Sequence, residues 1–295
     1  MTITFSTCFY IIKSKFDPTT YIQWMNNLIS IVNQFNLVIY TDLTTSAYIN
    51  TSNNRRIKVI IKEIQEFYNY QYRNEWIENH RHNNRLNGGT CWDLNMLWSE
   101  KIWFVKETID NLYFDTDAYG WCDIGYFRNR TNDTQTNKLT NWGIMNEDMD
   151  SKICYACICN DETYMKALRQ IVLTKNQHGL PVKEIPSNQN SFAGGFFIMR
   201  KDRIDWWANE YDTKLKLYFK HNYLVKDDQI IIADCILSNP EHFNVFRENN
   251  PAYDNWFMFQ RIHFTIRDHV AHSKVEQNTL QPLTKVVPKM QPNNL

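Results

Sequence analysis

A chain of 295 residues, 43% apolar and 15% aromatic, is long enough to bury a sizeable core as one large α/β domain or two small ones. Its 32 basic and 32 acidic residues cancel, so nothing in the charge favours nucleic acid or an anionic membrane as partner. The N-terminus makes a weak signal peptide, and no apolar run is long enough to span a bilayer. Seven cysteines are an odd number for a disulfide framework. We therefore expect a cytoplasmic protein without a transmembrane segment.

The first sixty residues alternate between strand and helix patterns. Residues 4–12 (TFSTCFYII) are a β-prone run, and Asp17 and Pro18 then supply the cap and first position of an amphipathic helix. Residues 37–40 (LVIY) form a continuous apolar run, which is typical of a parallel strand covered on both faces. Residues 56–64 predict a third strand. Strand, helix and strand in this order indicate a βαβ start and an α/β fold.

The segment after the second strand holds the first candidate site residue. Ligands of open α/β sheets bind beyond the carboxyl ends of the strands, so Asp42 is placed where a nucleoside could be bound. An acid that only caps a turn explains Asp42 equally well. Residues 78–89 are polar and end in glycine, and they predict a loop. An apolar stripe from Leu94 to Ile109 predicts the next helix, and Lys101 lies beside this stripe, where it can snorkel to solvent.

The second half of the chain continues the strand and helix alternation. Residues 152–159 (KICYACIC) contain three cysteines, which we interpret as buried strand residues because no second Cys-x-x-Cys or His pair follows at zinc-site spacing. Residues 191–200 (SFAGGFFIMR) are a glycine pair leading into a strand. Asp227 and Asp228 precede a helix that begins QIIIADCIL, with the acids at its positive end. We expect one domain over residues 1–270, followed by a flexible tail over 271–295.

Two acidic centres compete for the working site. Asp115 and Asp117 have the acid-x-acid form by which sugar-nucleotide enzymes hold a metal ion, but only three apolar residues precede them. Asp123, by contrast, follows the apolar run 118–122 (AYGWC), and a strand end fixes a carboxylate. Gly125 has no side chain, so a pyrophosphate could approach its backbone. The sequence therefore favours Asp123, with one carboxylate where such motifs usually have two.

Four segments together resemble one protein family. The chain is similar, over roughly residues 3–265, to the bacterial HtrL/YibB-type proteins, which are regarded as GT-A-type glycosyltransferases. The resemblance is carried by WDLNMLWSEKIWFVKETI, YGWCDIGYFR, SFAGGFFIMR and DDQIIIADCIL, in that order. It implies an α/β, GT-A-like single domain with a central, mostly parallel sheet flanked by helices. It also implies a nucleotide-sugar donor and a divalent ion, Mn²⁺ or Mg²⁺.

The resemblance further implies roles for individual residues. Asp123 would hold the metal or the donor ribose, and His263 would be a second metal ligand, although a lone histidine among aromatic residues also suits a core. Asp228 would be the catalytic base or bind sugar hydroxyls, with Asp227 able to exchange roles with it and a helix cap as the structural alternative. Arg128 would neutralise the diphosphate, unless it is a surface arginine. The implied donor-binding set is Asp42, Lys101, Asp123, Gly125, Arg128, Gly194, Gly195 and Gln229.

The function expected from the sequence is transfer of a hexose from a nucleotide sugar, UDP-linked in the first instance, to a hydroxyl of a glycan or protein. A catalytically inactive nucleotide or sugar binder on the same fold is the alternative, and the missing second acid favours it. Another nucleotide-dependent transferase, such as a nucleotidyltransferase, is a third possibility. No GxxxxGK[ST] loop is present, which argues against a P-loop enzyme.

Overall fold

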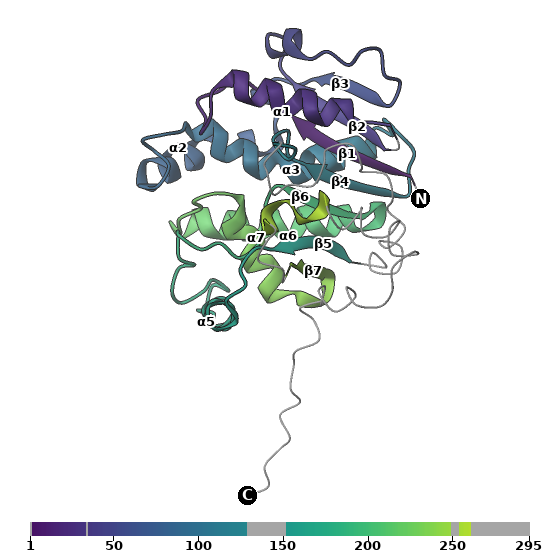
Figure 1. Cartoon of the computed structure of the whole chain (residues 1–295). Coiled ribbons are helices and arrows are strands. Elements are labelled where there is room, and N and C mark those ends of the chain that lie inside the picture. The colour runs from purple at the N-terminus through teal and green to yellow at the C-terminus, as the bar shows by residue number, and fades with distance from the viewer. Residues whose placement is uncertain (1, 34, 129–151, 249–253, 261–295) are drawn as a thin grey trace, which may run out of the picture.

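Seven strands form one sheet within the residues that the computed structural model describes, 2–33, 35–128, 152–248 and 254–260. Their order across the sheet is β3-β2-β1-β4-β6-β5-β7. All neighbours pair in parallel except β6, which is antiparallel to both β4 and β5 (Figure 1). The strands are β1 (Ile3–Cys8), β2 (Asn36–Thr41), β3 (Ile57–Ile61), β4 (Ala118–Cys122), β5 (Ile153–Cys157), β6 (Phe196–Arg200) and β7 (Phe243–Arg247). The predicted α/β domain with a mostly parallel sheet is confirmed.

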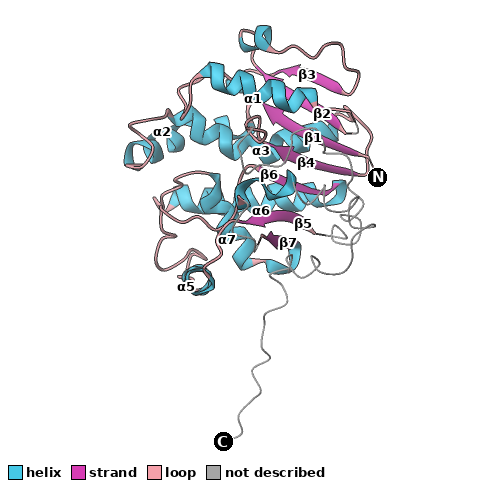
Figure 2. Ribbon diagram, in the orientation of Figure 1, coloured by secondary structure: helices cyan, strands magenta, loops and turns pink. Residues whose placement is uncertain are grey.

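Helices cover both faces of this sheet (Figure 2). One face packs in a large apolar cluster with α3, α6 and α7, and the other in a smaller cluster with α1 and the short turn Asn255–Phe257. The α-helices are α1 (Pro18–Ser30), α2 (Arg73–His82), α3 (Trp92–Asp110), α5 (Glu162–Leu173), α6 (Ile204–Lys220) and α7 (Asp228–Ser238). Burial of both faces explains why β1, β2, β4 and β5 are buried along their whole length.

The long helix α3 is fixed against the centre of the sheet. The Trp121 ring of β4 stacks on Phe104 of α3, with ring centroids 5.8 Å apart and planes inclined by 15°. On the same face, Thr108 of α3 hydrogen-bonds Ser6 of β1 at 2.8 Å and Tyr40 of β2 at 2.9 Å. These contacts set the rotation of α3 about its axis, and with it the direction of every side chain on that helix.

The sequence predicted the start of α1 correctly but predicted a loop over part of α2. Asp17 caps α1 by accepting the Thr20 backbone N–H at 2.9 Å, and Pro18 is the first helical residue, as predicted. The loop predicted over residues 78–89 is instead helical up to His82. Trp76 explains the difference: its ring is buried against the domain, and this tertiary contact holds a helix that the polar composition did not indicate.

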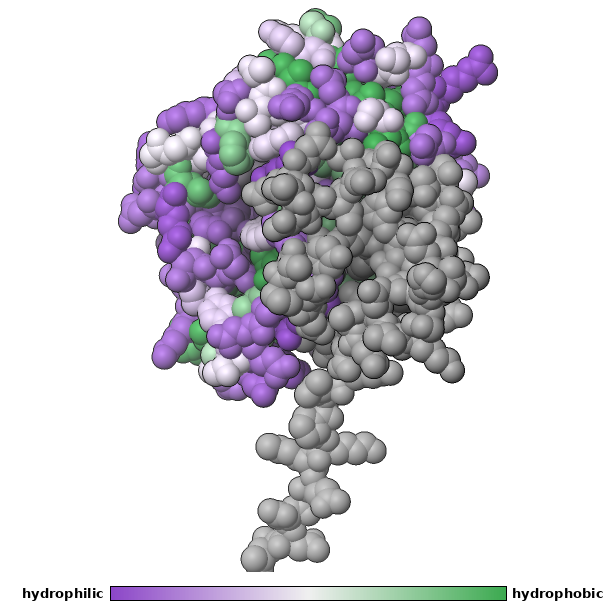
Figure 3. Space-filling view, in the orientation of Figure 1, coloured by the Kyte–Doolittle hydropathy of each residue, from purple (hydrophilic) through white to green (hydrophobic). Residues whose placement is uncertain are grey.

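The cysteines of β5 lie as expected for strand residues. Cys154 packs in the cluster on one face of the sheet and Cys157 in the cluster on the other, so they do not share a metal. All seven cysteines of the chain are free. No helix in the described part of the chain is long and apolar enough to cross a bilayer. Figure 3 shows a mostly hydrophilic surface on the described part of the visible face, with small apolar groups between.

Candidate active site

A cavity of about 530 Å³ opens at the carboxyl ends of β1 and β4. Its walls come from the segment after β1, from α3, from the glycine pair before β6, and from the first residues of α7. This is where an open α/β sheet binds its ligands, and the volume suits a small organic ligand. Most of the predicted site residues line it: Lys101, Asp123, Gly125, Arg128, Gly194, Gly195, Asp227, Asp228 and Gln229.

Asp123 stands where the sequence predicted it, immediately after β4. Its backbone N–H donates to the Gly195 carbonyl at 2.8 Å, so the strand pairing with the β6 side continues through this residue. Its Oδ1 accepts a hydrogen bond from the Trp121 indole N–H at 2.5 Å and forms an ion pair with Lys101 Nζ at 3.1 Å. About a third of the side chain, 36%, is exposed in the cavity. The carboxylate is therefore held through Oδ1, and the exposed part of the side chain faces the cavity.

The competing acids Asp115 and Asp117 lie at the other end of the same strand. They precede β4, whereas Asp123 follows it, and Asp117 accepts the backbone N–H of Thr2 at 2.9 Å near the amino end of β1. Neither lines the cavity. The acid-x-acid tripeptide belongs to the connection between α3 and β4, as the short apolar run before it indicated.

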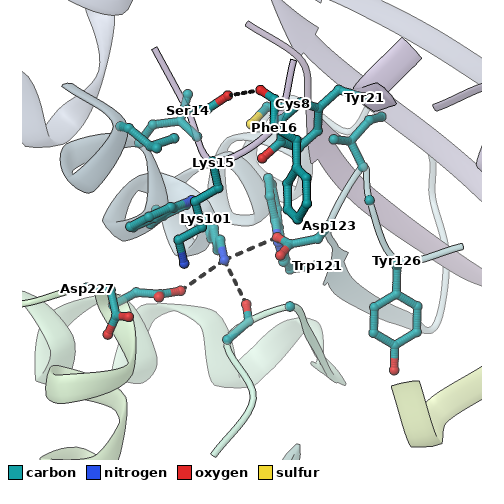
Figure 4. Close-up of a pocket in the computed structure, with 18 of the residues that line it drawn as sticks. Cys8, Ser14, Lys15, Phe16, Tyr21, Lys101, Trp121, Asp123, Tyr126 and Asp227 are labelled. Atoms are coloured by element: carbon teal, nitrogen blue, oxygen red, sulfur yellow. Dashed lines mark hydrogen bonds and ion pairs between the residues drawn. The ribbon is translucent and has the colours of Figure 1, made fainter. Parts of the chain in front are cut away.

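Lys101 occupies the centre of the cavity floor. Three dashed lines converge on its nitrogen in Figure 4. Nζ lies 3.1 Å from Asp123 Oδ1, 3.0 Å from Asp228 Oδ2 and 2.9 Å from the Gly194 carbonyl oxygen. Burial works to lower the Lys101 pKa, but the charges of the two acids outweigh it and the pKa is raised. The two acids thus favour the charged ammonium form of Lys101.

The expectation that Lys101 snorkels to solvent was wrong. The residue is only 5% exposed because the packing of Phe104 and Thr108 turns this face of α3 toward the sheet and the glycine loop. The helical pattern alone placed Lys101 beside the apolar stripe. It could not show that two carboxylates, distant in the sequence, meet it there.

Asp228 and Asp227 stand side by side at the start of α7 and have different partners. Asp228 is the first helical residue and faces Lys101, while Asp227, just before the helix, pairs with Lys226 at 2.7 Å. Neither side chain caps the helix, so the capping alternative for Asp228 was wrong. Burial raises the pKa of Asp228 to about 6; Lys101 opposes this rise, and the neighbouring Asp227 adds to it.

Three asparagines fix the segment that carries these acids. Asn79 of α2 hydrogen-bonds the Val225 carbonyl at 2.8 Å and accepts its N–H at 2.9 Å. Asn83 and Asn95 donate to the Lys226 carbonyl at 2.9 and 3.0 Å. These bonds satisfy a buried backbone that would otherwise be costly to bury. They also place the start of α7 against α2 and α3, a role that the sequence analysis did not assign to any of the three.

The two glycines before β6 lie against carboxylates that leave little space for a side chain at either position. A Cβ on Gly194 would lie 2.5 Å from Asp228 Oδ2, a separation that real atoms do not adopt. A Cβ on Gly195 would lie 3.2 Å from Asp123 Oδ2. The absent side chains therefore make room for the acids themselves. Room for a donor sugar beside these glycines stays a prediction.

Gly125 and Arg128 pack with aromatic rings at the cavity wall. A Cβ on Gly125 would lie 2.7 Å from the Trp24 ring, so this glycine makes room for Trp24 of α1. Arg128 donates from Nε to the Gly125 carbonyl at 2.7 Å, and its guanidinium lies 4.4 Å from the Trp24 ring centroid. Arg128 is thus oriented at the cavity and is not a simple surface arginine. The approach of a pyrophosphate to Gly125 stays a prediction.

The remaining predicted site residues have structural roles or lie outside the description. The Gln229 amide donates to the Phe192 carbonyl at 2.6 Å and so holds the loop before β6. Asp42 is not part of the cavity; both its oxygens bind Thr45, at 2.7 and 2.8 Å, which is the turn cap that the sequence left open as an alternative. His263 and the expected tail over residues 271–295 lie outside the described residues.

Several cavity residues were missed from the sequence. Lys15 is exposed, lines the cavity, and places its Nζ 4.9 Å from the ring centroid of Trp98. Phe16 and Trp256, which are 43% and 38% exposed, add aromatic surface. Lys15 and Phe16 follow β1, so their position after the first strand of an α/β unit was the signal that could have identified them.

The described donor set does not fit the expected Mn²⁺ or Mg²⁺. These ions require oxygen ligands at about 2.0–2.2 Å in a near-octahedral arrangement. Asp123 is a single carboxylate whose Oδ1 is bound by a cation already, and the second acid of the motif is replaced by Gly125 beside Trp24. Among the described residues, no three His, Cys, Asp or Glu side chains cluster in a way that suits a metal ion.

The fold and the site together define an α/β protein with a charged ligand cavity at the carboxyl ends of its parallel strands. No family model and no curated protein matches the sequence. Among 114 similar chains of solved structures is mouse Xyloside xylosyltransferase 1 in its apo form, with 12% identity over 83% of this chain and 85% of that chain, and a TM-score of 0.46. Likeness at this level does not indicate a shared activity. The resemblance to the HtrL/YibB-type proteins stays a prediction.

Proposed function

We propose that this protein is a glycosyltransferase that moves a hexose from a nucleotide sugar, UDP-linked in the first instance, to a hydroxyl of a glycan or protein. The observation that carries the proposal is the pairing of Asp123 and Asp228 across Lys101 on the floor of the cavity. These three residues come from three of the four segments that carry the sequence resemblance, and 105 positions separate the two acids. Both acids face the place where α/β sheets bind nucleotides.

Each carboxylate has a role that suits its surroundings. Asp123 is partly exposed at a strand end, and its outward oxygen can accept hydrogen bonds from the ribose hydroxyls of the donor. Asp228 is buried, and with a pKa of about 6 it is ionised at neutral pH yet able to take up a proton. Asp228 therefore acts on the reacting sugar and the acceptor hydroxyl, and Asp227, which is paired with Lys226, supports it.

The transfer step follows from these roles. The bond between the anomeric carbon and the diphosphate oxygen breaks, and its electron pair stays on the diphosphate. A new bond forms between the anomeric carbon and the acceptor oxygen, whose proton passes to Asp228. Arg128 and Lys15, at the cavity wall, lie where they can stabilise the charge that develops on the leaving group. All seven cysteines are free, which supports a reducing, cytosol-like compartment for this reaction.

A donor screen tests the proposal. Purified protein is incubated with a panel of UDP- and GDP-linked sugars, once with Mn²⁺ and once with EDTA, and free nucleotide is measured. We expect release from at least one donor, stimulated by a suitable acceptor and lost in Asp228→Asn. If no sugar nucleotide is cleaved under either condition, the protein is not a transferase of this class. UDP binding by calorimetry without any turnover would favour the inactive binder.

A further inference from the structure

Three oxygens on the cavity floor converge on one point, as the ligands of a cation do. They are Asp123 Oδ1 at the end of β4, Asp228 Oδ2 at the start of α7, and the Gly194 carbonyl oxygen before β6. The atom at their centre is Lys101 Nζ, at 3.1, 3.0 and 2.9 Å respectively. Such distances suit N–H···O bonds from an ammonium group and are about 1 Å too long for Mg²⁺.

Moving the Lys101 ammonium away from this point would be energetically unfavourable. The residue is 5% exposed, and its ammonium lies 5.9 Å from the Trp121 ring centroid. Withdrawn from the three oxygens, it would be a buried charge without a partner. Asp228, equally buried, would lose the cation that compensates its own charge. Moving the ammonium away while both carboxylates stay ionised is strongly unfavourable for this reason.

The described residues around Asp123 do not provide a separate metal site. A divalent ion bound to the remaining oxygen of Asp123 would stand within a few ångströms of the Lys101 ammonium, and the two cations would repel each other. A second carboxylate at position 125 is impossible without moving Trp24, since even a Cβ there would lie 2.7 Å from that ring. Among the described residues, the end of β4 thus offers no second carboxylate beside Asp123 with which to hold a metal against a diphosphate.

Basic side chains at the cavity wall can meet the diphosphate directly. Arg128 has a planar fork of donors that suits phosphate, and its position is fixed by its bond to the Gly125 carbonyl and by the Trp24 ring. Lys15 makes no ion pair with any described residue, so its ammonium group is available to pair with an anionic ligand. Both residues line the same cavity as Lys101.

We propose that Lys101 is a built-in cation that takes the place of a divalent metal ion, and that the nucleotide diphosphate is bound by Lys15 and Arg128 in a metal-independent reaction. The inference rests on the proposed glycosyltransferase function and specifies its electrostatics. Lys101 holds Asp123 and Asp228 in position and cancels part of their charge, so that an anionic donor can enter. It is a positioning residue, because its ammonium group donates a hydrogen bond to the Gly194 carbonyl and forms ion pairs with both carboxylates.

The first test measures Mn²⁺ binding and needs no substrate. Titration calorimetry or electron paramagnetic resonance with Mn²⁺ alone compares the full-length protein with Asp123→Asn. We expect no binding that depends on Asp123 at Mn²⁺ concentrations up to about 1 mM, a range that covers functional metal sites of moderate affinity. Mn²⁺ binding that disappears in Asp123→Asn would overturn the proposal. This result is decisive whether or not a donor has been found.

The second test uses whichever donor the screen identifies. Turnover in EDTA should remain within about threefold of turnover in Mn²⁺. Lys101→Met should lower kcat by about 10² or more, the scale of a lost electrostatic contact in an active site. Lys106→Met, which removes a half-buried lysine outside the cavity from the same helix, is the matched control and should leave kcat unchanged. An absolute need for Mn²⁺, or a folded Lys101→Met with full activity, would refute the built-in cation but leave the glycosyltransferase assignment intact.

A third readout separates positioning from simple folding. Circular dichroism and thermal unfolding first establish that Lys101→Met is folded. If it is, the pH dependence of its residual kcat/KM should be displaced to higher pH by at least one unit, because Asp228 has lost its nearest cation. A folded variant with an unchanged pH profile would contradict the role assigned to Lys101. If the variant does not fold, the Mn²⁺ titration and the EDTA comparison on the natural protein decide.

Discussion

Replacing Asp228 with asparagine should make the protein more stable and much less active. Burial raises the pKa of Asp228 from its ordinary value of 3.8 to about 6, so the ionised carboxylate is disfavoured in the folded state. Each pKa unit corresponds to about 1.4 kcal/mol, which gives a penalty on the order of 3 kcal/mol at neutral pH. Asparagine has the same shape without the charge. We expect the free energy of unfolding to rise by about 1–3 kcal/mol at pH 7.5.

The pH dependence of this gain follows from the direction of the pKa change. The folded pKa lies above the unfolded one, so the natural protein loses stability as the pH rises from about 4 through about 6. The gain from asparagine is complete above pH 6 and shrinks as the pH falls toward 4. Urea unfolding of both proteins at pH 7.5 and 4.5 measures the difference, which should fall to about 1 kcal/mol at the lower pH.

Asp234 on the same helix is a matched control. It is also fully buried, but it is held by Lys175 at 2.7 Å and by Lys214 at 3.0 Å. Burial would raise its pKa, yet the two lysines outweigh burial and the pKa is lowered. Its ionised form therefore adds stability above the unfolded pKa, and this contribution is lost as the pH falls through the folded pKa. Asp234→Asn should destabilise the protein at pH 7.5, opposite in sign to Asp228→Asn.

Activity measurements complete this prediction. Asp228→Asn should lower kcat by about 10² or more, the scale of lost general acid–base catalysis, while UDP affinity stays nearly unchanged. A loss of more than about 1 kcal/mol of stability at pH 7.5 would show that the Lys101 ion pair outweighs burial, which refutes the reasoning. Loss of nucleotide binding with kcat intact would show that Asp228 anchors the donor and that the base is elsewhere, first at Asp227.

Three further outcomes are expected. Asp123→Asn should abolish turnover in a folded protein, whereas Asp115→Asn and Asp117→Asn, at the opposite end of β4, should reduce it less than threefold; the reverse pattern in kcat would show that the wrong acid was chosen. Gly194→Ala places a Cβ 2.5 Å from Asp228 Oδ2, so it should cost about 1–3 kcal/mol in urea unfolding and lower kcat at least tenfold, and an unaffected variant would contradict the crowding. The kcat/KM of the natural protein should rise with pH through about 6 and then level off, since the base must be ionised; a profile flat from pH 5 to 8 would exclude Asp228 as that base.

Features that depend on neighbours in the sequence were predicted from the sequence itself. The cap at Asp17 and Pro18, the apolar run of β2 and the run AYGWC of β4 each act through contacts within a few residues. The choice of Asp123 over Asp115 followed from the same reasoning, because a strand end fixes the residue that comes directly after it. The α/β class follows from the alternation of these elements, since each hydrophobic period requires its own kind of packing.

What only the tertiary structure decided is the meeting of residues far apart in the chain. The sequence pattern placed Lys101 beside an apolar stripe. The packing of α3 turns this residue toward Asp123 and Asp228, which are 22 and 127 positions away in the chain. The sequence could not show that the absent side chain of Gly125 makes room for Trp24. Helical periodicity gives the face on which a side chain lies and nothing about what that face meets. Charge, space and pKa at this site therefore come from the assembled fold.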